Sequence, residues 1–316
     1  MNRRRFLPIA ATPLFLSPRT ASAKVTLPMA TAFVGETSFD SILAKATKEN
    51  WSRLPIGGRM IKTAHELRGR PYKGYTLEIH DHVESPSCNL HGLDCWTFFE
   101  QCLGFARMIG WRREKYTPAD LLREIEFTRY RRGVCTGNYL DRIHYLAEWF
   151  FENQARGVAD DITRDLGPAS RMSGRKVSEM TTLWKSYRYL KNNPSLRPKM
   201  AQHERRIERL PVYYIPKAKV RSVEKKLKDG DIAGIVTRYN GGFCSHVGLI
   251  VRTGDGTARF FHASTKYKKV VIDSSISAYL NSVSSHAGLI IARPNENSKT
   301  VLDPATYKKN LKRLGA

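Results

Sequence analysis

The chain has 316 residues, of which 41% are hydrophobic, and its formal net charge is +24 at pH 7. This length leaves room for one large domain or two smaller ones. No stretch of the sequence is long and apolar enough for a transmembrane helix, so membrane-spanning helices are excluded and the mature protein is expected to be soluble.

The first 23 residues have the features of a signal peptide. Three arginines at positions 3–5 precede a short apolar stretch over 6–16, and Ala-Ser-Ala at 21–23 supplies small residues for cleavage. The stretch Arg-Arg-x-Phe-Leu resembles a twin-arginine export signal. We therefore expect an exported protein, periplasmic or secreted, whose charge falls from +24 to +20 with the loss of four arginines. A disordered basic tail is the alternative interpretation.

Residues 24–160 have mainly helical periodicity. Helices are predicted over 39–49, with Ser38 or Asp40 as the cap, over 118–126, and over 139–154, after Gly137-Asn138. Between the first two, residues 95–106 are apolar at most positions, which indicates a buried helix with Asp94 as its N-cap.

Residues 164–228 are polar and strongly basic. They hold 18 Lys and Arg against 5 Asp and Glu, and Gly-Pro and Asn-Pro pairs interrupt them. We expect a basic helical insertion of one or two helices outside the core, within a single domain over 24–316. Such a surface attracts polyanions, and for an exported protein anionic cell-envelope polymers are better candidates than nucleic acid. A solvated face without a partner is the alternative.

From residue 231 onward the pattern changes to short apolar strands separated by turn residues. Five strands are predicted, over 231–237, 246–252, 259–263, 269–273 and 287–293. Helices followed by a run of strands indicate an α+β fold, in which the N-terminal helical part packs on a C-terminal antiparallel five-strand meander.

Cys95 is a candidate nucleophile. It follows the predicted N-cap and so lies in the first turn of a helix, where free backbone N–H groups and the helix dipole favour a thiolate. Five cysteines in an exported chain leave at least one thiol unpaired, and Cys102 is expected in the core. The pairing among Cys88, Cys102, Cys135 and Cys244 stays open. A packed, inert Cys95 is the alternative.

His246 and His262 form a candidate base and orienter. A hairpin centred on Gly254, with a three-residue loop over 253–255, places the two histidines directly opposite each other. Opposed residues share a face of the sheet, so one imidazole can orient the other, as a nucleophilic triad requires. A register slip of one residue would turn one ring to the other face.

A metal site is the competing interpretation of the histidine-rich stretch before Cys95. His80, His82, Cys88, His91 and Cys95 lie within sixteen residues, but no Cys-x-x-Cys is present and the His-x-His pair stands alone. We therefore expect no metal and no cofactor, with His80 and His82 in a solvated loop.

Several motifs in this order resemble those of a known family. They are Pro71-Tyr72, Thr76-Leu77-Glu78, Leu93-Asp94-Cys95-Trp96-Thr97-Phe98-Phe99-Glu100, Arg142-Ile143-His144-Tyr145 with Trp149 and Asn153, Gly230-Asp231-Ile232, Ser245-His246-Val247-Gly248 and His262-Ala263-Ser264. From about residue 60 to 293 the chain resembles the N-acetylmuramoyl-L-alanine amidase-like family, a branch of the NlpC-type papain-like cysteine cell-wall hydrolases. Trp96 departs from the aliphatic residue that usually follows the cysteine.

The resemblance implies a papain-like core with a catalytic set of Cys95 as nucleophile, His246 as base and His262 as orienter. It implies hydrolysis of the amide between the muramoyl lactyl group and L-alanine in murein-derived muropeptides. A cut between D-glutamate and the diamino acid, and a non-catalytic wall-binding protein, are the alternatives. Candidate substrate contacts are Asp94, Trp96, His144, Tyr145 and Ser245. For His144 and Tyr145, an aromatic core face is the alternative.

Overall fold

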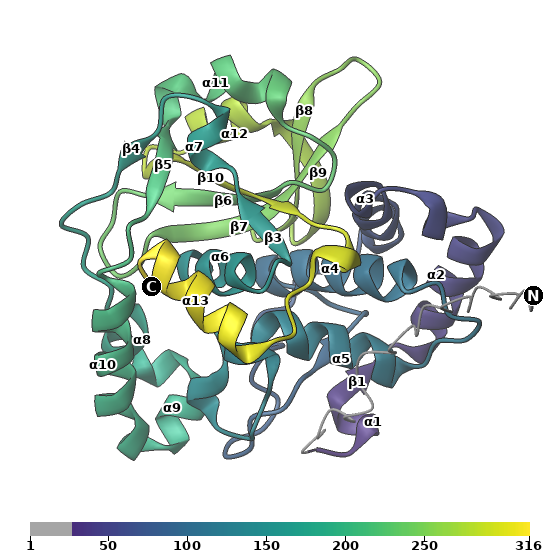
Figure 1. Cartoon of the computed structure of the whole chain (residues 1–316), viewed down its shortest axis with the longest axis horizontal. Helices are drawn as coiled ribbons and strands as arrows, with labels where there is room; N and C mark the ends of the chain where they lie inside the picture. The colour runs from purple at the N-terminus through teal and green to yellow at the C-terminus, as the bar shows by residue number, and fades with distance from the viewer. Residues whose placement is uncertain (1–26) are drawn as a thin grey trace, which may run out of the picture.

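The computed structural model describes residues 27–316, so the predicted signal peptide over 1–23 lies outside the described residues. A mixed sheet-and-helix fold in three layers holds two hydrophobic cores, one on each face of the central sheet (Figure 1). This confirms the predicted α+β class. Within residues 27–316 no helix combines the length and apolarity needed to cross a bilayer.

The N-terminal half is helical. Its helices are α1 (Met29–Ala32), α2 (Glu36–Lys48), α3 (Ile56–Leu67), α4 (Cys95–Gly110), α5 (Pro118–Arg129) and α6 (Leu146–Ala155), and a short parallel pair joins β1 (Phe33–Val34) to β2 (Cys88–Asn89). The first predicted helix starts earlier than expected. Gly35, at φ 108°, is its N-cap without a side-chain cap bond, so Ser38 and Asp40 lie inside the helix and neither caps it.

The helix predicted over 139–154 is broken. A single 3₁₀ turn covers Tyr139–Asp141, and α6 starts only at Leu146. Between this turn and α6 the chain lies against the end of α5, where Ile143 N–H donates to Arg129 O. The buried Arg142 guanidinium of the same stretch pairs with Glu78 at 2.9 Å. These partners are distant in sequence, so local periodicity did not reveal the break.

The sheet contains the five predicted strands and three more, all paired antiparallel. The predicted strands are β6 (Ile232–Thr237), β7 (Cys244–Arg252), β8 (Ala258–Ser264), β9 (Lys269–Ser275) and β10 (His286–Pro294). Their order is β10-β6-β7-β8-β9, so the last strand crosses back to pair with β6 and the predicted simple meander is wrong. Helix α12 (Ile276–Asn281) makes that crossing.

The basic segment over 164–228 is not peripheral, which corrects the prediction. It adds β5 (Tyr213–Pro216), paired with β10, and β4 (Ser170–Arg171), paired with β5, while β3 (Ala159–Asp161) pairs with the other end of β10. Val220, Val223 and Leu227 pack into the core on the sheet's second face, which α7, α11 and α12 cover (Figure 1). The segment's helices are α7 (Thr163–Leu166, which begins one residue before it), α8 (Glu179–Thr182), α9 (Arg188–Asn192), α10 (Arg197–Ile207) and α11 (Val220–Val223), and α13 (Pro304–Leu314) closes the chain.

Helix α4 carries the predicted nucleophile and is buried between α3, α5 and the sheet. Its predicted N-cap is confirmed: Asp94 Oδ1 accepts from Thr97 N at 2.7 Å, and Thr97 Oγ1 accepts from Asp94 N at 3.0 Å. This reciprocal capping box satisfies two backbone N–H groups, that of Thr97 in the first turn of the helix and that of the N-cap Asp94. It fixes where α4 begins, and so fixes Cys95 as the first helical residue.

Candidate active site

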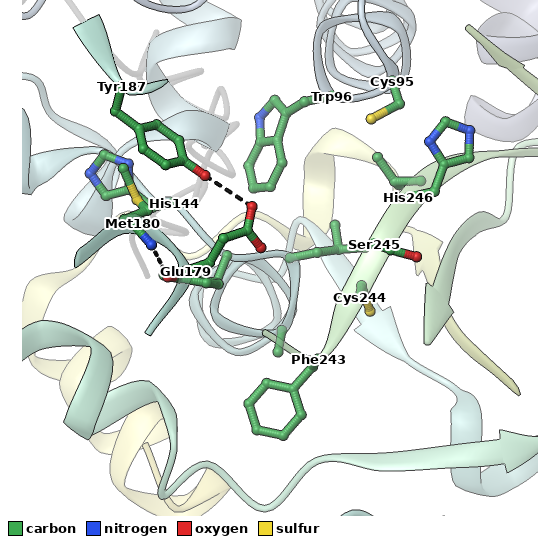
Figure 2. A pocket seen from close by; sticks show the side chains of 14 residues that line it. Cys95, Trp96, His144, Glu179, Met180, Tyr187, Phe243, Cys244, Ser245 and His246 are labelled. Carbon is green, nitrogen blue, oxygen red and sulfur yellow. Dashed lines mark hydrogen bonds between the residues drawn. The ribbon is translucent and has the colours of Figure 1, made fainter. Parts of the chain in front are cut away.

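Cys95 lies at the N-terminus of α4 and lines a pocket together with His246 on β7 (Figure 2). All five cysteines are free thiols, and Cys102 is fully buried in the core as predicted. Backbone amides of Val247, Trp96 and Cys95 favour the Cys95 thiolate, but burial and the neighbouring Asp94 carboxylate together raise the pKa of the thiol to about 12. The predicted effect of the helix start is present, because these amides lower the pKa of the thiol, but desolvation outweighs it.

His246 and His262 meet, although not in the predicted register. Strand pairing aligns Leu249 with Phe261, which centres the hairpin on residue 255 and places His262 two residues from the position directly opposite His246. The shift is even, so both side chains stay on one face. His246 Nε2 lies 2.6 Å from His262 Nδ1, and the two rings are nearly perpendicular at 84°.

Asp273 on β9 continues this array, and the sequence analysis missed it. His262 pairs with Val271, so Asp273 stands two residues along on the same face, with Oδ2 3.5 Å from His262 Nε2. A strand ending in an acidic residue beside the strand of an orienting histidine is the signal that could have identified it. His246, His262 and Asp273 therefore form one polar array that crosses three strands, and Cys95 lines the pocket at its His246 end.

The array admits one set of tautomers in which His246 acts as a base. If Nδ1 of His246 is to accept the Cys95 proton, its proton resides on Nε2 and is donated to His262 Nδ1. His262 is then protonated on Nε2, facing the Asp273 carboxylate. This order of donors pairs Nε2 of His246 with Nδ1 of His262, directs the Nε2–H of His262 toward Asp273 at 3.5 Å, and leaves Nδ1 of His246 for the thiol.

Burial keeps both histidines neutral. It lowers the pKa of His246 well below its ordinary value, with further lowering from His262 and His286. It also lowers the pKa of His262 to about 4, although Asp273 acts in the opposite direction. The Phe260 ring stacks on His262 at 4.5 Å, which excludes water from it. The Cys95 thiol and both imidazoles are therefore neutral at pH 7.

Ser245 lies at a β-bulge beside His246. On β6, Ile235 pairs with His246 and Val236 with Cys244, so Ser245 is the extra, exposed residue. A bulge bends its strand locally and redirects neighbouring side chains, which is why such irregularities occur beside active sites. Here it lets Cys244, Ser245 and His246 all line the pocket.

The pocket has a volume of about 130 Å³, and four of the five predicted substrate contacts line it: Trp96, His144, Tyr145 and Ser245. Asp94 does not. Its carboxylate caps α4 by accepting from Thr97 N and also accepts from the Thr76 hydroxyl at 3.3 Å, so the structure places Asp94 behind the pocket wall and its contact with substrate stays a prediction.

Two of the predicted contacts present little polar function to the pocket. Tyr145 donates its hydroxyl to the buried Glu204 carboxylate at 2.5 Å. His144 Nε2 lies 3.1 Å from Tyr139 O, and burial lowers the pKa of His144 well below its usual range. Both side chains therefore shape the wall of the pocket.

The basic segment supplies the opposite wall, which the sequence analysis did not anticipate. Glu179 and Met180 of α8, and Tyr187, line the same pocket as Cys95 (Figure 2). The Tyr187 hydroxyl donates to Glu179 Oε1 at 2.9 Å. No local motif distinguishes these residues in a segment that is polar throughout.

The histidines considered for a metal site lie apart from this pocket. His82 Nδ1 is 3.0 Å from Asn193 Oδ1, and His80 Nδ1 accepts from the backbone N–H groups of His82 and Val83. In the part of the chain that the structure describes, no three His, Cys, Asp or Glu side chains are grouped as metal ligands.

Comparison with known proteins identifies a family whose match includes the residues that line this pocket. Residues 62–289 match the family described as N-acetylmuramoyl-L-alanine amidase-like. An N-acetylmuramoyl-L-alanine amidase from Bacteroides uniformis ATCC 8492 is 28% identical, with a TM-score of 0.66 over 76% of this chain and 99% of that one. A proposed xylanase from Bacteroides fragilis is 30% identical, with a TM-score of 0.65 over 73% and 98% of the two chains.

A Legionella pneumophila protein, 19% identical, shares the fold alone, with a TM-score of 0.61 over 82% of this chain and 95% of that one. No curated protein matches the sequence. The family match covers more than two thirds of the chain and includes the pocket, Cys95, His246, His262 and Asp273. The chain belongs to the N-acetylmuramoyl-L-alanine amidase-like family.

Proposed function

We propose that the protein is a cysteine amidase of the NlpC-type papain-like branch, which hydrolyses the amide between the muramoyl lactyl group and L-alanine in murein-derived muropeptides. Family membership supports the cell-wall amidase activity. The observation that carries the cysteine mechanism is the polar array that runs from the pocket through His246 and His262 to Asp273.

In the proposed mechanism, Cys95 Sγ attacks the amide carbonyl while its proton passes to Nδ1 of His246. The backbone N–H of Cys95, at the helix start, donates to the oxyanion. The imidazolium then protonates the leaving amine of L-alanine, and the C–N bond breaks to leave a thioester on Cys95. Water, deprotonated by His246, attacks the thioester and releases the lactyl carboxylic acid and the free thiol.

His262 and Asp273 act as positioning residues in this scheme. The buried His262 holds the proton of His246 on Nε2, and the Asp273 charge stabilises the imidazolium that forms next to His262. His246 and His262 thus take the roles of base and orienting residue in a serine-type triad, and Asp273 is a fourth residue that faces the orienting His262. It also explains how a thiol with a raised pKa reacts, because the proton leaves during the attack.

The test is to incubate the purified protein with defined muropeptides and identify the new termini by mass spectrometry. The proposal predicts a free sugar-lactyl acid and an intact stem peptide that begins with L-alanine. Cys95→Ser should abolish this release, whereas Cys244→Ser, which changes another cysteine of the same pocket, should leave most of it. A stem cut between D-glutamate and the diamino acid would contradict the assignment of the bond.

Export and surface binding are part of the same proposal. Cleavage after residue 23 would deliver a single mature domain to the compartment that contains murein. Exposed basic side chains of 164–228, such as Lys199, Arg205 and Arg209 around α10, would bind anionic cell-envelope polymers. N-terminal sequencing of the protein recovered from the periplasm or medium tests the cleavage, and an intact Met1 would contradict it.

A further inference from the structure

The end of the pocket away from Cys95 carries an acidic side chain with no established role. Glu179 points into the pocket opposite Trp96, with the Tyr187 hydroxyl beside it (Figure 2). Tyr187 donates to Oε1 at 2.9 Å, and among residues 27–316 no Lys, Arg or His is paired with this carboxylate. A second oxygen and the remaining lone pairs are therefore available to a donor on a ligand.

Glu179 is held in place by its backbone. Its N–H donates to Gly241 O at 3.0 Å, and the next two amides, of Met180 and Thr181, donate to the buried Glu204 carboxylate at 2.9 and 3.2 Å. Glu204 is 1% exposed and also accepts the Tyr145 hydroxyl. Hydrogen bonds therefore hold the start of α8 to the loop before β7 and to Glu204 of α10, which also binds Tyr145 of the pocket wall. Such preorganisation is expected of a binding site.

Trp96 offers an aromatic surface next to this carboxylate. Its Nε1 donates to Glu100 at 3.2 Å, and its ring contacts Phe99 edge to face at 5.6 Å. These contacts hold the indole and direct its N–H donor into the protein, so what the indole presents to the pocket is apolar ring surface.

An aromatic surface beside carboxylate and hydroxyl groups suits two kinds of ligand, an ammonium group or a sugar ring. The surrounding segment carries 18 basic against 5 acidic residues, which disfavours the approach of a cation. A pyranose ring is neutral, has an apolar C–H face for Trp96, and carries hydroxyl and amide donors at its rim for Glu179. The charge of the segment therefore favours the sugar.

We propose that Trp96, Glu179 and Tyr187 form the subsite for the pyranose ring of the substrate, with Glu179 as its specificity-determining acceptor. This inference rests on the proposed function and deepens it. The carbonyl that Cys95 attacks is joined to the sugar through one carbon and an ether oxygen, so a ring on Trp96 lies next to the nucleophile. Trp96, which follows Cys95 directly, is suitably placed for that ring.

Binding and turnover test the subsite separately. In calorimetry, the Cys95→Ala protein should bind N-acetylmuramic acid, and adding Glu179→Ala should weaken binding by about ten- to a hundredfold. Glu179→Gln, which keeps an acceptor oxygen, should weaken binding less. Asp165→Ala, an exposed acid of the same segment that does not line the pocket, is the matched control and should leave binding unchanged.

Turnover is compared on N-acetylmuramoyl-L-alanyl-D-isoglutamine and on D-lactoyl-L-alanyl-D-isoglutamine, which lacks the sugar. Glu179→Ala should raise KM about tenfold on the first and leave the second unchanged. Equal losses on both substrates, or no binding of N-acetylmuramic acid by a protein that cleaves the first, would overturn the subsite. Sugar binding without cleavage of either substrate would instead contradict the proposed function. If Glu179→Ala lowers turnover only on a third substrate, whose stem is extended by a diamino acid, Glu179 binds an ammonium group and the sugar proposal is overturned.

Discussion

Replacing Asp273 with asparagine tests the extended array at the residue farthest from the nucleophile. The substitution keeps the size of the side chain and removes its charge. His262 Nε2 lies 3.5 Å from Asp273 Oδ2, and His246 lies beyond the His262 ring, so the carboxylate is roughly 8 Å from the forming imidazolium. At an effective dielectric constant of about 20, that separation contributes about 2 kcal/mol, or roughly thirtyfold in rate.

The assay is kcat on a defined muropeptide, together with the pH dependence of kcat/KM. Asp273→Asn should lower kcat by about thirtyfold, and because the imidazolium loses a stabilising charge, the acidic limb of the profile should move to lower pH. Asp165→Asn, an exposed acid outside the array, is the control. A kcat within about twofold of the wild type, with an unmoved acidic limb, would refute the role of Asp273.

Three further predictions follow from the strands that carry the histidines and from the basic segment. Gly248→Ala should lower activity about a hundredfold, because a Cβ at this position would meet Phe261 O at 2.7 Å and His262 Cβ at 2.8 Å. Gly254→Ala is the control and should leave activity unchanged, because the space around Gly254 in the hairpin loop is open. The pKa of His262 is about 4 in the folded protein and about 6.5 when unfolded, so the unfolded chain binds more protons between these values and stability falls as pH drops through them. Between pH 7.5 and 4.5, the free energy of unfolding measured in urea should fall by about 2–3 kcal/mol more for the wild type than for His262→Asn. Equal falls for the two proteins would contradict the lowered pKa of the buried His262. Binding of the protein to purified sacculi should weaken steeply with salt if the 164–228 surface provides it, and salt-independent binding would contradict that role.

Local signals predicted the start of the site well. The capping box of Asp94 and Thr97 depends on residues within a single turn, so the sequence suffices to place Cys95 at the N-terminus of a buried helix. The shared face of His246 and His262 was also predictable, because it requires only an even offset between the strands. The hairpin centre was not, because Asp255 accepts from Thr253 Oγ1 and Thr257 N and thereby selects a different loop.

Long-range contacts account for what the sequence did not reveal. Strand β5 is four residues long and is defined by its pairing with β10, more than seventy residues later in the chain. The raised pKa of Cys95 arises from burial by the whole fold, which no local pattern reports. Glu179 reaches the pocket because Gly241 O and the Glu204 carboxylate, both distant in sequence, bind the backbone amides at the start of α8.

The most direct test of the central claim is to trap the acyl-enzyme. Acid quenching of the protein during turnover of a muropeptide, followed by intact and peptide mass analysis, should reveal a sugar-lactyl adduct, linked as a thioester, on the peptide that contains Cys95. The adduct should be absent from Cys95→Ser, which lacks the thiol, and from His246→Ala, in which the neutral thiol has no base to take its proton. Release of the sugar-lactyl acid by Cys95→Ser at the wild-type rate, with no adduct on any cysteine, would contradict the assignment of Cys95 as the nucleophile.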